Sequence, residues 1–128
     1  MRTIKFKVWD NVDYMSNPFT LQDLQKKKIQ FTNDCKVLQF TGLTDKNGIE
    51  IFEGDIIKVQ DYNGNWSRDG AEVVFSNDYV GGWVISNGNQ NLNLGTRQIY
   101  LEIIGNIYEN PELLNSSSID GVELTVGL

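Results

Sequence analysis

The sequence contains no histidine and only one cysteine, Cys35, among its 128 residues. The absence of histidine excludes Ser-His-Asp and Cys-His catalysis, zinc sites that need an imidazole, and the commonest general base near neutral pH. A single cysteine cannot form an internal disulfide, a zinc cluster or a CxxC redox pair, and it suits a reducing cytoplasm. We expect Cys35 to be a buried or half-buried small residue. The sequence therefore predicts no catalytic residues, no cofactor and no metal ligands.

Long hydrophobic runs are also lacking. No segment approaches the roughly 18 to 20 apolar residues of a membrane-spanning helix. The opening stretch MRTIKFKVWD alternates apolar with charged side chains, unlike a secretion signal. Hydrophobic residues make up 40% of the chain, which is enough for the core of one folded domain of this length. We expect a soluble intracellular domain without a membrane partner.

Positive charge is scarce after the first third of the chain. Residues 1–40 carry seven Lys or Arg and four Asp or Glu, whereas residues 41–128 carry four and thirteen. Two interpretations remain open. Either neighbours in the fold pair these charges, or the basic head contacts the acidic body of another copy or a different partner.

Clusters of Asn and Gly, such as DKNG, DYNGN and NGNQN, divide the chain into short runs of Ile, Val, Phe, Tyr and Trp. Asn and Gly tolerate positive φ and mark tight turns, and the runs between them suit a half-buried pleated surface. This pattern predicts a mainly β fold, a small partly open or closed SH3-like β-barrel with one short helix. The expected strands cover residues 3–9, 37–41, 71–76, 79–86 and 98–108, and Pro111 should follow the last of them.

The helix is predicted over residues 20–28, in the stretch TLQDLQKKK. Thr20 can cap its first turn, Asp23 suits the positive end of the helix dipole, and Lys26, Lys27 and Lys28 suit the negative end. Leu21 and Leu24 are expected to form its buried stripe. In the preceding strand, alternation places Ile4, Phe6 and Val8 on one face and Lys5 and Lys7 on the other.

The stretch TDKNGIEIFEGDIIKV, residues 44–59, is rich in carboxylates and invites three interpretations. A calcium loop of the EF-hand type fails, because aligning its glycine with Gly48 places Leu43 and Gly54 at the two end ligand positions. A metal or acid–base site would have to use Glu50, Glu53 and Asp55, and nothing in the sequence places these side chains in a cleft. Alternation puts Glu50 on the solvated side of a strand, opposite the side chains of Ile49 and Ile51.

The third interpretation, two strands joined by a turn, explains this stretch best. Asp45, Asn47 and Gly48 form a strong turn signal, with Gly48 free to adopt positive φ. The alternation changes phase near Gly54, which predicts a bulge or a sharp bend there. These four residues are predicted to be structural.

Several residues are candidates for contact with a partner. Trp66 lies in a polar turn, where an exposed aromatic ring suits a protein interface. Lys26, Lys27 and Lys28 form the densest basic group, and together with Arg2, Lys5 and Lys7 they could contact nucleic acid. The aromatic region of residues 60–108 is poor in Lys and Arg, which disfavours a surface that stacks bases.

Three segments together resemble the YopX-like family of phage and prophage proteins. They are MRTIKFKVWD at the start, LQFTGLTDKNGIEIFEGDIIKV in the middle and LEIIGNIYENPELL near the end. In that family a K-F-x-x-W-D opening, a T-G-L-x-D-K-N-G-x-x-I-x-E-G-D-I hairpin and an I-G-N-I-Y-E-N-P-E-L-L ending recur in this order. The resemblance covers residues 1–114. Residues 115–128 lie beyond it and are expected to be a polar tail or a strand exchanged with a neighbour.

The resemblance implies a small, mainly β protein encoded by a phage or prophage and acting in the cytoplasm of the bacterial host. It implies no assigned activity and no catalytic residues. The preferred hypothesis is a non-enzymatic accessory protein that binds a host or phage protein and forms a homo-oligomer. Nucleic-acid binding during phage replication or regulation is the alternative. A metal-dependent hydrolase is the third and least favoured hypothesis.

Overall fold

The computed structural model describes residues 4–27, 34–60, 66–76, 82–86, 91–94 and 101–114. These residues are mostly in strands, which confirms the mainly β prediction. In chain order the elements are β1 (Phe6–Trp9), α1 (Leu21–Lys27), β2 (Lys36–Thr44), β3 (Glu50–Phe52), β4 (Asp55–Gln60), β5 (Trp66–Ser76), β6 (Gly82–Ser86), β7 (Asn91–Asn93) and β8 (Leu101–Asn106).

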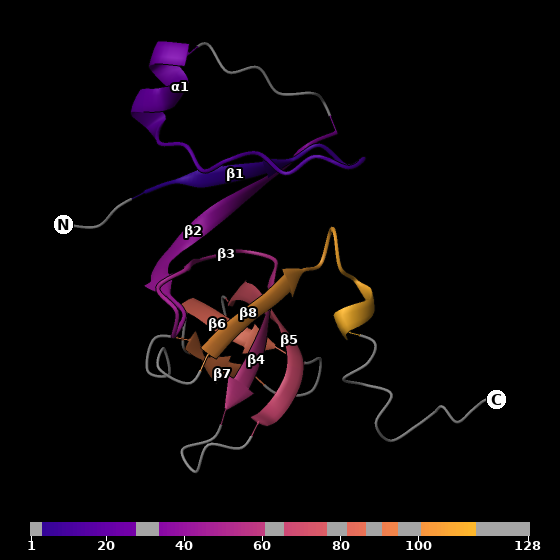
Figure 1. The fold of residues 1–128 in the computed structure, drawn as a ribbon. Coiled ribbons are helices and arrows are strands. Elements are labelled where there is room, and N and C mark those ends of the chain that lie inside the picture. Colours follow the sequence, from indigo (N-terminus) through magenta and orange to yellow (C-terminus); the bar gives the residue numbers. More distant parts are fainter. Residues whose placement is uncertain are drawn as a thin grey trace.

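The strands form two antiparallel sheets, one in the order β1-β2-β3 and the other in the order β7-β6-β5-β4-β8. Figure 1 shows β2 running from the upper part of the molecule, beside β1, down to the body formed by β3 to β8. β7 and β8 are the two edges of the five-stranded sheet and do not pair with each other. A closed barrel, one form of the prediction, is therefore wrong for the described residues. The SH3-like arrangement stays a prediction.

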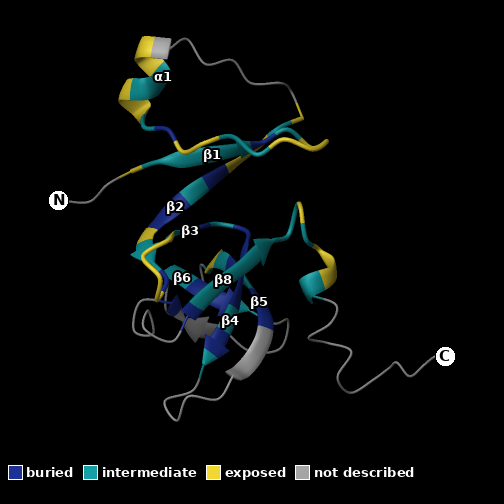
Figure 2. Cartoon of the chain, in the orientation of Figure 1, coloured by how far each residue is buried: buried dark blue, intermediate teal, exposed yellow. Residues whose placement is uncertain are grey.

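The core lies against one face of the five-stranded sheet. Alternation along β4, β5 and β6 directs every second side chain to this face, as half-buried strands require. β3 contributes one further core side chain. Figure 2 shows that burial is concentrated in this body. The core consists of Ile51, Ile57, Val59, Ala71, Val73, Ile85, Leu94 and Leu101.

Both predicted turns of the acidic stretch are present. Gly48 has a φ of +81° in the turn between β2 and β3, and Gly54 has a φ of +88° between β3 and β4. The strands expected at residues 71–76 and 79–86 are present as β5 and β6, which pair antiparallel, and residues 77–81 between them lie outside the described residues. The last strand, β8, ends at Asn106, before Pro111. This strand is predicted to begin at residue 98, and residues 98–100 also lie outside the described residues.

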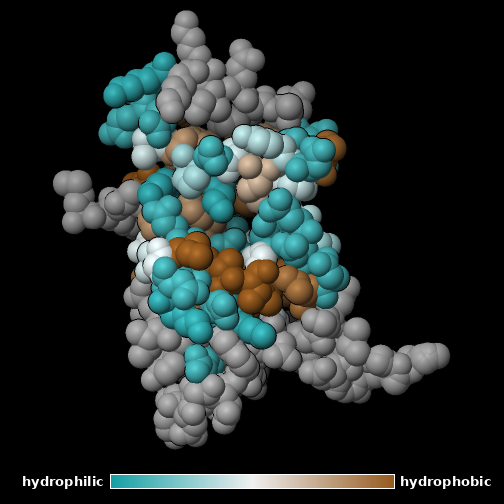
Figure 3. Space-filling model, in the orientation of Figure 1, coloured by the Kyte–Doolittle hydropathy of each residue, from teal (hydrophilic) through white to brown (hydrophobic). Residues whose placement is uncertain are grey.

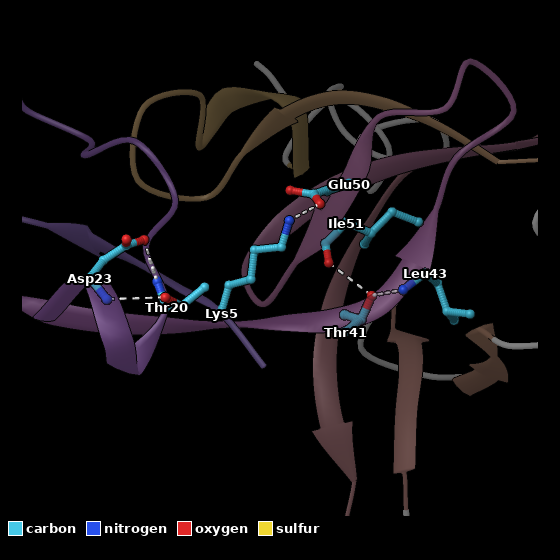
Figure 4. A network of polar contacts seen from close by, with 7 residues as sticks. All are labelled: Lys5, Thr20, Asp23, Thr41, Leu43, Glu50 and Ile51. Atoms are coloured by element: carbon cyan, nitrogen blue, oxygen red, sulfur yellow. Dashed lines mark hydrogen bonds and ion pairs between the residues drawn. The ribbon is translucent and has the colours of Figure 1, made fainter. Parts of the chain in front are cut away.

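The helix is confirmed over Leu21–Lys27, and the last predicted residue, Lys28, lies outside the described residues. Its capping box forms as predicted, because the Asp23 amide donates to Thr20 Oγ1 at 3.1 Å and the Thr20 amide donates to Asp23 Oδ2 at 3.0 Å (Figure 4). The predicted buried stripe is wrong at Leu21, which is 56% exposed. Within the described residues, no helix has the length and apolarity to cross a membrane.

Candidate functional site

The N-terminal layer, which we define as residues 4–27 with residues 36–39 of β2, stands apart from the core of the body. β1 pairs on one side with β2 and on the other with the segment before α1, through bridges of Phe6 to Phe19 and of Trp9 to Met15. The helix consequently begins beside the first residue of β1, and loop 10–14 follows its last residue. The two features occupy opposite ends of the layer, as Figure 1 shows.

The inner face of the layer carries the lysines of β1. Lys5 Nζ forms an ion pair with Glu50 (Figure 4). It also lies 5.1 Å from the centroid of the Phe40 ring. Lys7 Nζ lies 4.4 Å from the centroid of the Phe52 ring. Both side chains thus cover aromatic rings at the junction with the body, where cation–π contact adds to the packing of their aliphatic stems.

This inner face changes two interpretations of the sequence. Glu50 is half-buried and paired with Lys5, so its placement on an ordinary solvated face is wrong. Lys5 and Lys7 point toward the body, not toward the surface that carries Lys26. They therefore do not extend a single basic patch with the helix lysines, as nucleic-acid binding through these residues would require.

The outer face of the layer carries the apolar residues of β1. Ile4 is 48% exposed, while Phe6 and Val8 are half-buried. Val37, which pairs with Val8 across the β1–β2 register, is 50% exposed. The alternation along β1 is as predicted, but its charged side faces the body and its apolar side faces outward. We call Ile4, Phe6, Val8 and Val37 the outer face.

Loop 10–14 is an exposed loop built around one carboxylate. Asp10 Oδ1 accepts hydrogen bonds from the backbone amides of Val12 at 2.8 Å, Asp13 at 3.0 Å and Tyr14 at 3.0 Å. The amides of Tyr14 and Val12 hold the pKa of Asp10 below its ordinary value, because they favour the ionised form. The loop thereby presents two large apolar side chains, Val12 at 76% exposure and Tyr14 at 59%.

Of the predicted lysine group, the structure describes Lys26 and the backbone of Lys27. Lys26 is exposed in the last turn of α1, and Lys27 is the last residue of the helix. The side chain of Lys27 and the whole of Lys28 lie outside the described part of the chain. Figure 3 shows the hydrophilic surface of α1 at the upper left, and hydrophobic surface gathered across the middle of the molecule at the level of β8.

Asp45 connects the turn after β2 to the edge of the five-stranded sheet. Its side chain is only 4% exposed, and its Oδ1 accepts from the amides of Asn47 at 2.8 Å and Ile49 at 3.0 Å. Its Oδ2 accepts from the amide of Ile103 in β8 at 3.0 Å. The Lys46 amide donates to the Leu101 carbonyl at 2.9 Å. The Asp45 side chain and the positive φ of Gly48 therefore shape a turn that also covers an edge strand, and Asn47 takes part through its backbone amide.

Gly54 lies where the three segments of the family resemblance meet. Its amide donates to the Val73 carbonyl and its carbonyl accepts from the Ile107 amide, both at 2.9 Å. A Cβ added at Gly54 would lie 2.9 Å from the ring of Tyr108. The Tyr108 ring also packs on Trp9, with 5.9 Å between centroids. The opening, middle and closing segments thus share one packing site, which joins the N-terminal layer to the body.

The carboxylates of the acidic stretch are distributed around this junction. Asp55 is 6% exposed, and burial raises its pKa to about 6 even though its Oδ2 accepts from the Phe52 amide at 2.8 Å. Burial, together with the negative charge of Glu53, raises the pKa values of Glu72 and Tyr108. In the described part of the chain, no three Cys, Asp or Glu side chains gather as a metal ion would require.

Other candidates fall partly or wholly outside the described residues. Trp66 begins β5, but its side chain is not among those described, so its role as a contact stays a prediction. Residues 115–128, the expected tail or exchanged strand, lie outside as well. Cys35 is a free, half-buried thiol.

Sequence reasoning did not single out Val12 and Tyr14 as exposed residues. One signal could have found them, because Asp10 precedes a short polar stretch and Asp side chains commonly bond the amides two residues on. Nothing in the sequence of β1 itself indicates that its apolar side faces outward. It depends on Phe40 and Phe52, which are more than 30 positions away from β1.

A search of the curated proteins finds no match to this chain. Among solved structures, the chain is similar to the crystal structure of protein EF1440 from Enterococcus faecalis, with 23% sequence identity and a TM-score of 0.54. The similarity covers 89% of this chain and 99% of that one, and at this identity it supports the fold alone. The sequence profile described as YopX protein matches residues 4–115. This chain therefore belongs to the YopX family.

Proposed function

We propose that this protein is a phage or prophage accessory protein that works by binding other proteins in the cytoplasm of its bacterial host, without catalysis. One observation carries the proposal. Among the large apolar side chains that are exposed in the described residues, most belong to the N-terminal layer. Exposed apolar side chains gathered in one region favour a protein interface. These residues are Ile4, Val12, Tyr14, Leu21 and Val37.

The rigidity of the layer supports the same proposal. β1 is bonded along both edges, since the Phe6 and Phe19 backbones exchange hydrogen bonds of 2.9 Å and the Ser16 amide donates to the Val8 carbonyl at 2.9 Å. A surface that is already ordered loses little conformational entropy when a partner binds. The outer face is therefore suited to recognition.

Binding to protein is favoured over the two other hypotheses by the placement of charge. Lys5 and Lys7 are directed toward Phe40 and Phe52 at the junction, so they do not add to the exposed positive charge of Lys26 in α1. The partners of Asp55 and Glu50 are a backbone amide and Lys5, respectively. Because both carboxylates form contacts within the fold, we interpret them as structural groups and not as the metal-binding or acid–base groups of a hydrolase.

The test is co-purification from phage-infected host cells with a tagged protein, with and without nuclease. We expect a host or phage protein at fixed stoichiometry that resists nuclease treatment. Val37→Lys, in the outer face, should abolish its capture. Ile49→Lys is the matched control, because Ile49 has a similar exposure of 54% in the turn between β2 and β3. Capture of nucleic acid alone, or partners lost with nuclease, would instead support the nucleic-acid hypothesis and refute this one.

A further inference from the structure

We propose that the edge of the sheet at residues 35–37 binds an extended segment of the partner protein, which adds as an antiparallel strand with an acidic residue opposite Lys36. This inference rests on the proposed function and specifies how the partner is recognised. It follows from three properties of the N-terminal layer: open backbone groups at this edge, a lysine at their centre and the apolar outer face beside them.

The backbone of β2 offers hydrogen-bonding groups to a further strand. The Phe40 amide donates to the Lys5 carbonyl at 2.9 Å, which places the even-numbered residues of β2 in the hydrogen-bonded pairs with β1. The amides and carbonyls of the odd-numbered residues therefore point away from β1. Within the described part of the chain, no hydrogen bond reaches the backbone of Val37, or of Cys35 just before the strand.

The open edge is bounded on one side by the body. The Gln39 carbonyl, which points the same way, accepts from the Glu53 amide at 2.9 Å, and the Gln39 amide donates to Glu53 Oε1 at 3.3 Å. An antiparallel strand beside Cys35 and Val37 could form four backbone bonds, two with each residue. The opposite edge of the layer differs, because Pro18 has no amide to donate and thus protects that edge.

Lys36 determines which strand fits this edge. It is exposed, lies opposite Trp9 in the β1–β2 register and forms no ion pair among the described residues. With backbone bonds at residues 35 and 37, the partner residue opposite Lys36 belongs to a non-hydrogen-bonded pair, whose Cβ atoms lie about 4.5 to 5.5 Å apart. An opposite charge at this distance stabilises the pair. The nearby Asp34 precedes the strand, in a turn.

The same lysine disfavours a second copy of this chain at the edge. Two copies could pair about a twofold axis, with residue 35 of each beside residue 37 of the other. This arrangement places the two Lys36 side chains directly opposite each other, and like charges in that position destabilise a strand pair. Lysine on an edge strand is a common protection against self-pairing. A different chain with Asp or Glu at this position avoids the repulsion.

The residues on either side of that acidic residue are expected to be apolar. Side chains alternate along a strand, so these two residues lie on the same side of the sheet as Val37. Val37 is 50% exposed and belongs to the outer face, beside the half-buried Val8. Apolar β-branched side chains pack well against such a neighbour. The partner segment therefore carries an acidic residue between two apolar residues.

Peptide titration of the full chain, followed by NMR, tests this inference. The probe is acetyl-Ser-Thr-Val-Glu-Val-Thr-Ser-amide. In the proposed pairing the amides of its two valines bond to β2, whereas the amide of its glutamate points away. N-methylation of both valines should therefore abolish binding, and N-methylation of the glutamate should change the affinity little. The amides of Cys35 and Val37 should exchange with solvent more slowly in the complex.

The charge of Lys36 gives a second measurement. Lys36→Glu in the chain, or lysine in place of the glutamate in the peptide, should each weaken binding about fivefold. The two changes together should restore it. Lys26→Glu is the matched control, because it makes the same charge change at an exposed lysine of α1 and should bind like the parent chain. Circular dichroism and thermal melting establish that each variant is folded.

Three results would overturn the inference: no binding of the probe, equal binding of the peptides methylated at the valines and at the glutamate, or an affinity that does not respond to Lys36→Glu. The capture experiment above does not use the probe, so the two tests fail separately. A protein that captures its partner through Val37 but ignores the probe would preserve the proposed function and refute the strand addition. Binding of the probe without capture of any protein from infected cells would refute the proposed function and leave the edge as a peptide-binding site.

Discussion

At the scale of single residues, Gly42 and Gly54 have the same backbone conformation in different surroundings. Both have a φ of +88°, but a Cβ at Gly42 would meet nothing within 4 Å, whereas one at Gly54 would lie 2.9 Å from the Tyr108 ring. Changing either glycine to alanine should cost roughly 1 to 2 kcal/mol for the left-handed backbone alone. Gly54→Ala should cost about 1 kcal/mol or more in addition, because the ring must move.

Urea unfolding of the two alanine variants measures this difference directly. Because the backbone contribution is shared, the excess at Gly54 reports the packing of Tyr108 alone. The intrinsic fluorescence of the folded Gly54→Ala variant should also change, since Tyr108 packs on Trp9. Equal destabilisation of the two variants would show that the Tyr108 ring moves away from the added Cβ without loss of stability.

Asp55 should make the protein less stable as the pH rises. Burial raises its pKa from 3.8 to about 6, so between these values the folded state holds a proton that the unfolded state has lost. Its contribution to stability is full below pH 4 and is lost as the pH rises through 6. The change amounts to roughly 3 kcal/mol at about 1.4 kcal/mol per pH unit.

The measurement is the free energy of unfolding of the parent chain and of Asp55→Asn between pH 3.5 and 7. Asn keeps an acceptor for the Phe52 amide, so the variant should fold. The variant should gain stability relative to the parent as the pH rises. Other groups titrate equally in both chains and cancel in the difference. A difference independent of pH would show that Asp55 does not hold its proton in this range.

At the scale of elements, the turn between β2 and β3 fastens the edge strand β8. Asp45→Ala leaves the amides of Asn47, Ile49 and Ile103 without their carboxylate acceptor. Loss of a buried charged acceptor should cost about 2 to 4 kcal/mol. Native-state hydrogen exchange checks the mechanism, since the amide of Ile103 should exchange much faster.

Asn47→Ala is the control for this prediction. The bond at Asn47 uses its backbone amide, so removing its side chain leaves all three bonds to Asp45 available. Its stability should change little, and protection of Ile103 should be unchanged. If the amide of Ile103 exchanged equally fast in the parent and in Asp45→Ala, the turn would not stabilise the edge strand β8.

Elements that depend on neighbouring residues could be predicted from the sequence. The capping box of Thr20 and Asp23 and the turn of Asp45 and Gly48 are each decided within four positions, and both were predicted correctly. The bend predicted at Gly54 is likewise a local feature, and Gly54 has a φ of +88° there.

The misassigned faces depend on contacts between distant segments. Alternation alone places Glu50 on a solvated face, yet Lys5, 45 residues away, pairs with it. The lysine side of β1 faces inward because its stems cover Phe40 and Phe52. Periodicity identifies two faces of a strand but not which of them another part of the chain will cover. The outer face, and with it the proposed interface, follows only from the three-dimensional structure.

At the scale of the whole molecule, the closing segment up to Leu114 is part of the body. The Leu113 carbonyl passes so close to Gly70 that a Cβ there would lie 2.7 Å from it, and the Leu113 side chain approaches Gly105. Two hydrogen bonds join Asn106 and Asn110 and hold the turn between them. The Asn110 amide donates to the Asn106 carbonyl at 2.8 Å, and the Asn106 amide donates to Asn110 Oδ1 at 3.2 Å. Leu113 therefore packs against β5 and β8 of the body.

Two truncations test where the folded unit ends. Removing residues 115–128 should leave the melting temperature nearly unchanged, because the packing of Leu113 is retained. Removing residues 111–128 should lower it by several degrees, since loss of a packed Leu commonly costs about 2 kcal/mol or more. If the protein forms the homo-oligomer expected from its sequence, the shorter removal should also leave that oligomer intact, because the exposed apolar residues of the N-terminal layer are retained. Loss of the oligomer at that step would instead identify residues 115–128 as exchanged strands.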